Sequence, residues 1–415
     1  MGAVLFPVLS LFVGVGILLV GIGLLFTALG LRAGLAAFPV SVTGLVMSAY
    51  FVGFIIGAFV CPGIIKRVGH IRAFAALASI ASTTAIVHAL VVDPWIWSLL
   101  RAITGFCLVG LYMVIESWLN VLAPNQHRGR VLAAYMAVTL VALALGQFLI
   151  LAGDVKGFVP FALVSILLSL ALVPIAMTRV EQPKAVEAPR LSLRHLYEIS
   201  PLGVYGALAS GLLNSAFYSM GAVFGQRIGL SEAEIAAFMS ATIIGGAALQ
   251  WPIGHFSDRH DRRVVLVVVC LFAAALATAA FLVVPRFHSA LAVIGFLYGG
   301  LVFTVYGLSI AHVNDYLKPA EVLEATSGLL LLHGIGASVG PAAAGALMDA
   351  LGPGSLLVYF TLILVMLGAL GLYRMRIRPS PVPSEHCEFV AMASSSRAAL
   401  EMDPRGDAEP ELRLG

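Results

Sequence analysis

Charged residues are scarce in this chain of 415 residues, since Asp, Glu, Lys and Arg together make up only 11% of it. Soluble globular domains contain about 25% charged residues, whereas 60% of this chain is hydrophobic. A single core in water could not bury that much apolar surface. The composition excludes an ordinary soluble domain and predicts a protein surrounded by lipid.

Cysteine is also rare. The four cysteines are scattered, without the CxxC pairs that are typical of metal sites or redox centres. Cys61, Cys107 and Cys270 fall inside apolar runs, which favours small buried side chains over reactive thiols. We therefore expect no metal and no cofactor.

Catalytic motifs are missing as well. The sequence contains no HExxH pattern, no nucleophile elbow and no phosphate-binding loop. Its carboxylates and histidines do not cluster within the apolar runs. We therefore expect no catalytic residues, no enzyme activity and no ATP-driven transport.

Long apolar runs dominate what is present. A bilayer core about 30 Å thick needs roughly 20 apolar residues per helix, and lipid offers no partner to unpaired backbone amides. The first run is uncharged and too long for the core of a signal peptide, so we expect it to remain as a span. Twelve runs of suitable length predict an all-α polytopic membrane protein, with spans near residues 5–31, 41–65, 72–92, 95–122, 131–152, 158–178, 202–225, 233–256, 264–285, 289–313, 323–348 and 355–377.

The positive charges predict the orientation. With both termini in the cytoplasm, 19 of the 24 lysines and arginines fall on inner loops or the tail, four on outer loops, and Arg101 inside a span. Cytoplasmic loops carry such an excess in membrane proteins. We therefore expect cytoplasmic termini.

A polar interval divides the spans six and six. It predicts bundles at 1–178 and 202–378, joined by a cytoplasmic linker at 179–201. The chain from 379 to 415 is rich in Pro, Ser and acids, which predicts a disordered cytoplasmic tail. Lys66 and Asp258 occupy corresponding loops 192 residues apart. Two parallel halves of this kind are the plan of a secondary transporter.

The loop Gly254–Arg263 reads GHFSDRHDRR and resembles the G-x-x-x-D-R-x-G-R-R motif of the major facilitator superfamily. Arg101 and Gly105 are similar to the start of that family's helix-4 motif. The strings ESWLN, HRGRVLAAYM and LGQ, between Glu116 and Gln147, resemble a YcaD-like branch of bacterial permeases. The resemblance covers residues 1 to about 378.

The resemblance implies a monomeric transporter of a small organic solute in the bacterial inner membrane, working by alternating access. Because many members of that family are coupled to protons, the resemblance also implies proton coupling. The expected partners are the solute, protons and the lipid bilayer, and no nucleic acid is expected to bind. Departures from the pattern are Lys66 in place of the motif's Asp, Asp261 in place of a Gly, and a G-x-x-x-G-P string on the eleventh span rather than the fifth.

Proton-driven efflux of drug-like or toxic compounds is an alternative function, and a membrane sensor that transports nothing is a more distant alternative.

Charge on the inner loops predicts a gate. Basic residues before the third and fifth spans face acids before the ninth and eleventh, and surface ion pairs of about 0–1 kcal/mol suit contacts that must break. The alternative is that these charges only satisfy the positive-inside rule. The predicted gate consists of Gly63, Lys66, Arg67, Gly69, Arg72, Arg128, Arg130, Gly254, Asp258, Arg259, Asp261, Arg262, Arg263, Glu321 and Glu324.

Polar groups at membrane depth are candidate site residues. Arg101, Tyr112 and Glu116 share one face of the fourth span, and the resemblance places helices 1, 4, 7 and 10 around the cavity. Glu116 is a candidate for proton coupling or substrate binding, or it neutralises Arg67 or Arg128. Arg101 binds an anionic group, or it extends toward the outer interface.

Other polar side chains on the cavity-lining spans are further candidates. These are Asn214 and Tyr218 on the seventh span, and Tyr298, Tyr306 and His312 on the tenth. For each one, an interhelical hydrogen bond is the alternative. Gln147, Gln250 and His333 lie on helices that the resemblance makes peripheral, so we expect them to pack.

Overall fold

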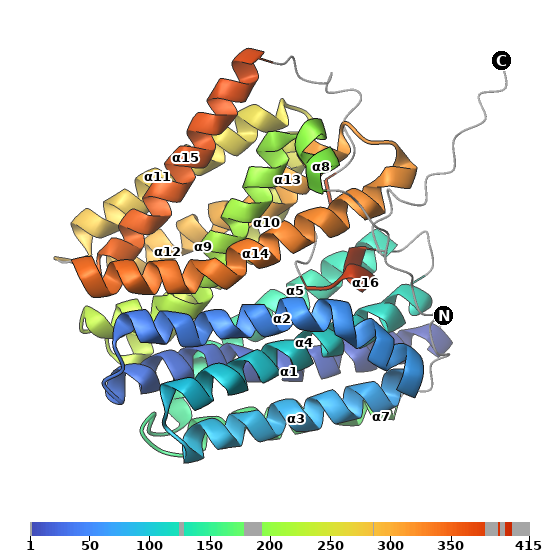
Figure 1. Ribbon diagram of the computed structural model, residues 1–415, viewed down its shortest axis with the longest axis vertical. Helices are drawn as coiled ribbons and strands as arrows, with labels where there is room; N and C mark the ends of the chain where they lie inside the picture. Colours follow the sequence, from blue (N-terminus) through green and yellow to red (C-terminus); the bar gives the residue numbers. More distant parts are fainter. Residues whose placement is uncertain are drawn as a thin grey trace.

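The computed structural model describes residues 2–123, 128–177, 193–284, 286–377, 389–390 and 395–400 (Figure 1). All regular structure in these ranges is helical, and 12 helical segments are long and apolar enough to cross a membrane. The predicted all-α fold with twelve spans is confirmed.

The helices form two bundles. The first contains α1 (Gly2–Leu35), α2 (Val40–Val68), α3 (His70–Leu90), α4 (Pro94–Leu122), α5 (Arg128–Phe148), the 3-10 helix η2 (Leu149–Ala152), α6 (Val159–Leu170) and α7 (Leu172–Ala176). The second contains α9 (Pro201–Arg227), α10 (Glu232–Asp258), α11 (Arg262–Val283), α12 (Ala290–Val302), α13 (Thr304–Asn314), α14 (Pro319–Leu351) and α15 (Ser355–Ile377). Two short helices, α8 (Leu193–Ile199) and α16 (Arg397–Leu400), lie outside these sets.

Two of the predicted spans are interrupted. The sixth breaks at Ala171 into α6 and α7, and the tenth breaks at Phe303 into α12 and α13. Both breaking residues keep helical backbone angles, so each pair continues in one direction as a single crossing. Hydropathy predicts the length of an apolar run but carries no signal for such a local change in hydrogen bonding.

Polar residues in the short loops begin several helices. The Asp93 carboxylate accepts hydrogen bonds from the amides of Trp95 and Ile96 at the start of α4. Ser231 and Glu234 form a reciprocal capping box at the start of α10. These groups satisfy amides that have no partner within the helix, so the few polar residues between spans also fix where the spans start.

Glycines let helices cross closely at matching places in the two halves. A Cβ atom at Gly53 or Gly105 would overlap the backbone of the other helix where α2 crosses α4. Gly245 and Gly299 do the same where α10 crosses α12. The two pairs are 192 and 194 residues apart. The internal repeat therefore appears in the packing as well as in the loops.

The two bundles meet along α2 with α14 and α5 with α10 (Figure 1). Hydrogen bonds join them at the end opposite α8, and we call this set the seam. Its members are Ser41 with Asp349 at 2.6 Å, the Ala342 amide with Ser48 at 3.0 Å, Ser240 with the Ala144 carbonyl at 2.7 Å, and Gln226 with the Leu31 carbonyl at 3.1 Å. The bundles are therefore fastened at this far end, and we call the opposite end, which carries α8, the linker end.

The outer surface of the bundles is apolar. Large side chains such as Leu99, Trp251 and Phe272 are more than 60% exposed. A water-soluble monomer rarely exposes such extensive apolar surface. The chain is therefore a multi-pass membrane protein whose exposed helix faces contact lipid.

The predicted linker and tail are described in part. Leu193–Ile199 of the linker form α8, and residues 178–192 lie outside the described residues. Residues 389–390 and 395–400 of the predicted disordered tail are described, and they pack against the bundles with Phe389, Ser396 and Ala399 buried. For these eight residues the structure differs from the expectation of disorder, and the rest of the tail lies outside the described residues.

Candidate functional site: a central cavity

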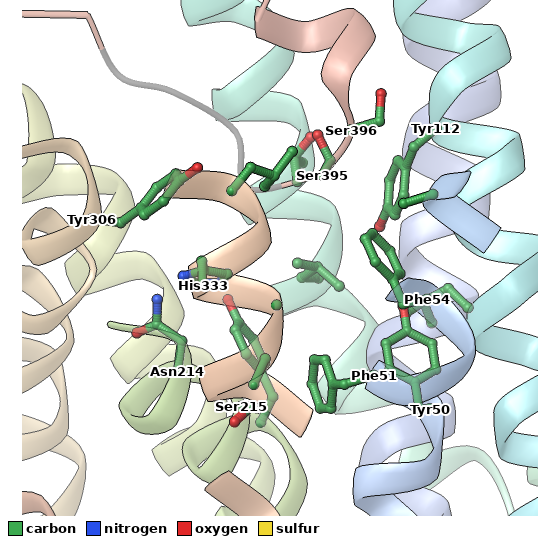
Figure 2. Close-up of a pocket in the computed structure, with 18 of the residues that line it drawn as sticks. Tyr50, Phe51, Phe54, Tyr112, Asn214, Ser215, Tyr306, His333, Ser395 and Ser396 are labelled. Carbon is green, nitrogen blue, oxygen red and sulfur yellow. The ribbon is translucent and has the colours of Figure 1, made fainter. Parts of the chain in front are cut away.

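A cavity of about 250 Å³ lies between the two bundles (Figure 2). Both halves line it, through α1, α2, α4 and α5 on one side and α9, α10, α13 and α14 on the other. Ser395 and Ser396 of the tail complete the lining. The volume suits a small organic molecule, although it is below the usual range of about 300–1,000 Å³ for drug-sized ligands.

The first bundle contributes an aromatic wall. Tyr50, Phe51 and Phe54 of α2 and Tyr112 of α4 stand on one side of the cavity in Figure 2. Tyr50 packs edge-on against Phe26 of α1, with ring centroids 5.1 Å apart. Such pairs add roughly 0.5–1.5 kcal/mol beyond burial alone. The wall is therefore stiff, and it offers ring faces and edges to an apolar or aromatic solute.

The second bundle contributes neutral polar groups. Asn214 and Ser215 of α9, Tyr306 of α13 and His333 of α14 lie across the cavity from the aromatic wall (Figure 2). His333 is already engaged, since its Nδ1 lies 2.9 Å from the hydroxyl of Ser210. The Asn214 side-chain oxygen and the Tyr306 hydroxyl have no hydrogen-bond partner within the described chain. These two atoms are available for hydrogen bonds to a solute in the cavity.

Arg101 lies directly behind the aromatic wall. Its side chain is 0% exposed, and its guanidinium carbon is 4.3 Å from the Phe26 ring centroid and 4.5 Å from that of Tyr50. None of its three side-chain nitrogens has a hydrogen-bond partner in the described part of the chain. The structure thus places Arg101 inside the first bundle, between two rings that line the cavity.

Glu116 lies near the other end of the same helix face and is also 0% exposed. Its Oε1 accepts a hydrogen bond of 2.7 Å from the Tyr135 hydroxyl. The hydroxyls of Ser395 and Ser396 donate to Oε1 and Oε2, respectively. All three donors line the cavity. Arg67, one of the predicted neutralising partners, is exposed at the end of α2.

The other predicted cavity residues divide into two groups. Tyr112, Asn214, Tyr218 and Tyr306 line the cavity. Tyr298 instead packs inside the second bundle, where its ring lies 5.4 Å from that of Phe360. His312 lies in a separate small pocket, with its ring 5.3 Å from that of Tyr316. Helical periodicity predicts which residues share a face, but not which neighbour that face meets.

Several lining residues were not among the predicted site residues. Gln147, Gln250 and His333, expected to pack on peripheral helices, line the cavity together with Tyr135 and Thr139 of α5. Gln147 also packs as expected, because its amide donates to the Gly23 carbonyl at 3.1 Å. The sequence signal for these residues was a polar side chain within an apolar span. It was not used because α5, α10 and α14 were assumed to be peripheral to the cavity.

The second-half gate loop forms ion pairs within its own half. Arg262, which is almost fully buried, contacts Asp258 at 3.0 Å and Asp315 at 2.8 Å. Arg263 contacts Asp261 at 2.7 Å, and Arg259 is exposed. These contacts tie the ends of α10 and α13 to the start of α11.

The first-half gate loop is more open. Lys66, Arg67 and Arg72 are exposed, and Gly69 turns the chain between α2 and α3 with a φ of 85°. Nothing lies within 4 Å of a Cβ atom placed at Gly63.

The remaining predicted gate residues belong to α5 and α14. Arg128 is half-buried and Arg130 is exposed at the start of α5. Glu321 accepts a hydrogen bond of 3.0 Å from the Lys318 amide at the start of α14, and Glu324 is half-buried. Pairing across the halves remains a prediction.

Two helical bundles around a central, jointly lined cavity define the architecture of a membrane transporter. The sequence profile of the Major Facilitator Superfamily matches residues 8–313 and 202–396. The chain belongs to this superfamily.

Similar proteins support this assignment. An uncharacterised MFS-type transporter of Enterobacter sp. (strain 638) is 31% identical over 319 residues, covering 75% of this chain and 81% of that protein. The uncharacterised transporter YcaD of Salmonella typhimurium (strain LT2) is 28% identical over 347 residues, covering 83% and 89%.

Solved structures share the fold. The nucleoside transporter NupG superposes with a TM-score of 0.73 at 14% identity, over 90% of this chain and 100% of that one. A bacterial homologue of the human lysosomal transporter Spinster, described as inward-facing and occupied, gives a TM-score of 0.73 at 16% identity over 92% and 97%. At these identities the likeness shows the fold alone.

Proposed function

We propose that this protein is a secondary transporter of the bacterial inner membrane, that it carries a small, mainly apolar or aromatic organic solute through the central cavity, and that protons drive it through Glu116. The observation that carries the proposal is the cavity itself, built by both bundles and bordered by one fully buried carboxylate. An aromatic wall opposite neutral polar groups favours a solute with a flat apolar body and a few hydrogen-bonding atoms.

Alternating access is supported by the way the bundles meet. The seam closes the far end, whereas the cavity reaches the tail residues at the linker end. The distribution of lysine and arginine assigns the linker end to the cytoplasm. On that assignment the seam closes the outer side, and the cavity extends toward the inner side, where tail residues line it.

Proton coupling is supported by the surroundings of Glu116. Burying an ionised carboxylate costs several kcal/mol unless it is paired or hydrogen-bonded. Its described partners are hydroxyl groups and a backbone amide, not a cation. A carboxyl in such a place can take up a proton on one side of the membrane and release it on the other as its hydrogen bonds change.

Efflux of drug-like compounds is the second candidate. It is favoured by the aromatic character of the wall, since ring faces accept many apolar molecules without directional contacts. The direction of flux in vesicles separates it from uptake, because proton antiport and proton symport move solute oppositely under the same pH gradient.

The test begins with purified protein. A thermal-shift screen against aromatic and amphipathic metabolites and drugs selects compounds, and flux of these compounds is measured in proteoliposomes with and without a pH gradient. We expect gradient-driven flux that falls to the empty-liposome rate in Glu116→Gln. The matched control, Glu198→Gln on the exposed surface of α8, should keep the full rate. Gradient-driven flux that survives in Glu116→Gln would remove this residue from the coupling.

A further inference from the structure

The described part of the tail is bound at three places at the linker end of the cavity. Phe389 occupies a site beside α10 and α13, Ser395 and Ser396 reach Glu116 on α4, and α16 packs against both α4 and α14. These contacts involve both bundles. A segment held by both halves is positioned to sense and resist their relative movement.

The first attachment depends on two glycines. A Cβ atom at Gly254 or at Gly307 would overlap the Phe389 ring, so the ring fills space that any larger residue would occupy. The Phe389 amide also donates a hydrogen bond of 2.9 Å to Asp258, which itself pairs with Arg262. The second-half gate loop therefore serves as the binding site for this part of the tail.

The second attachment occupies the proposed proton site. Ser395 and Ser396 donate to the two oxygens of Glu116, and the Ala399 amide donates to the same carboxylate. Ser396, Ala399 and Leu400 are almost completely buried. Both serines also line the cavity (Figure 2), so the contacts to Glu116 are made by residues that a solute in the cavity would meet.

We propose that the described tail residues, 389–390 and 395–400, act as an internal plug, which closes the cavity at the linker end and occupies Glu116 until it is displaced. This inference rests on the proposed function for its physiological meaning, because a closed path matters only if solute uses it. The plug can contact both bundles at once only in a conformation that holds them at the spacing seen here. Its binding therefore stabilises this conformation relative to others. Release of the tail is then a step of the transport cycle.

Accessibility of a cavity residue tests closure without needing a substrate. In a variant whose four native cysteines are replaced, Thr139→Cys on α5 reports on the cavity and Lys66→Cys reports on the exposed surface. We expect N-ethylmaleimide to label Thr139→Cys at least fivefold faster when residues 379–415 are deleted. Labelling of Lys66→Cys should not change. Equal labelling of Thr139→Cys with and without the tail would overturn the plug.

A milder variant guards against a general effect of truncation. Ser395→Ala combined with Ser396→Ala in the full-length chain removes the hydroxyls that contact Glu116 and leaves Phe389 in place. We expect labelling of Thr139→Cys to rise about twofold, less than in the truncated chain. A rise equal to that of the truncation would also support the plug, with its main attachment at Glu116. No rise in either variant would contradict it.

A disulfide tests whether the tail occupies its site in the membrane. A Cβ atom at Gly254 would lie 2.5 Å from the Phe389 Cγ. With a carbon–carbon bond of about 1.5 Å, the two Cβ atoms come within about 4 Å, which suits a disulfide. Gly254→Cys with Phe389→Cys should therefore crosslink rapidly with a mild oxidant, as detected by mass spectrometry. Each single variant is the control, and failure to crosslink would overturn the placement.

The two proposals fail separately. Faster labelling on truncation, together with no gradient-driven flux of any compound, would support the plug and reject the transport mechanism. Flux with unchanged labelling would support the transport mechanism and reject the plug.

Discussion

The two halves of the molecule pack alike but differ in chemistry. Gly23 and Gly146 bring α1 and α5 together, and Gly211 and Gly336 do the same for α9 and α14. Aligning Gly105 with Gly299 shifts the numbering by 194, so Arg101 corresponds to Gly295 and Glu116 to Ile310. The second half thus keeps the helix crossings and lacks both buried charges.

This difference indicates which features serve the fold and which serve the site. Close helix crossings are needed in both halves because each bundle must pack six spans with little apolar driving force between helices in lipid. A buried charge next to the cavity is expensive, so the first half carries Arg101 and Glu116 there and the second half supplies neutral groups across the cavity.

The largest expected effect is on the shared crossings. Gly105→Val and Gly299→Val each place side-chain atoms where the backbone of the neighbouring helix lies, which should cost more than the roughly 1–3 kcal/mol of ordinary overpacking. We expect both variants to lose most folded protein, as measured by size-exclusion chromatography in detergent. Gly63→Ala, which meets open space, should behave like the wild type. If only one of the two valine variants lost folded protein, the two helix crossings would not be equivalent in the two halves.

The next effect separates the two gate loops. Arg262 and Asp315 form an ion pair at 2.8 Å with both side chains almost fully buried. Removing one partner of a buried pair costs about 3–5 kcal/mol when the other charge is left unpaired. Arg262 keeps its ion pair with Asp258, so Asp315→Asn should cost less than that and still lower the thermal unfolding temperature measurably. Lys66→Met, in the exposed first-half loop, should change stability by no more than about 0.5 kcal/mol. Similar shifts in the two variants would show that the loops are equivalent after all.

Arg101 sharpens the comparison within the first half. Arg101→Met removes the cation between Phe26 and Tyr50, two rings that line the cavity. Cation–π contacts are worth roughly 2 kcal/mol when desolvated, so we expect flux to fall by about 10- to 100-fold. Arg101→Lys keeps the charge but loses the planar stacking and should be intermediate. The exposed Arg194→Met is the control, and full flux in Arg101→Met would refute the prediction.

The smallest effect concerns pairing across the halves. A double-mutant cycle of Asp258→Ala and Arg130→Ala, scored by flux, should give a favourable coupling of about 0.2–1 kcal/mol, as for exposed ion pairs. A latch between Asp258 and Arg130 predicts that the effects of the two substitutions on flux are not additive, however small the coupling energy is. If the effects of the two substitutions on flux are strictly additive, the two charges do not interact. The positive-inside rule would then be sufficient to explain the loop charges.

The sequence predicted the spans well because membrane insertion depends on local hydropathy. The polar interval between the sixth and seventh spans predicted a division into two sets of six, and the gate motif pointed to the family. The cavity was predicted less completely. Four of the eight predicted cavity candidates line it, and Glu116 contacts residues that do. Tyr298 and His312 point elsewhere because a face on a helix does not reveal which other helix it meets.

The packing of the described tail residues against the bundles was not predicted, for a different physical reason. Low hydrophobicity predicts that a segment cannot form a core of its own, and nothing in the described tail contradicts that. Phe389 and the residues around Ala399 instead use sites that the bundles have already built. Composition measures whether a segment can fold alone, and not whether it fits an existing surface.

The seam sets an energy scale for the working cycle. Its four hydrogen bonds between the bundles would be exchanged for bonds to water on opening, and each contributes only about 0.5–1.5 kcal/mol. A single proton moving through 100 mV releases about 2.3 kcal/mol. Under the proposed proton coupling, one to three protons per turnover would release as much free energy as these four hydrogen bonds contribute together, about 2–6 kcal/mol.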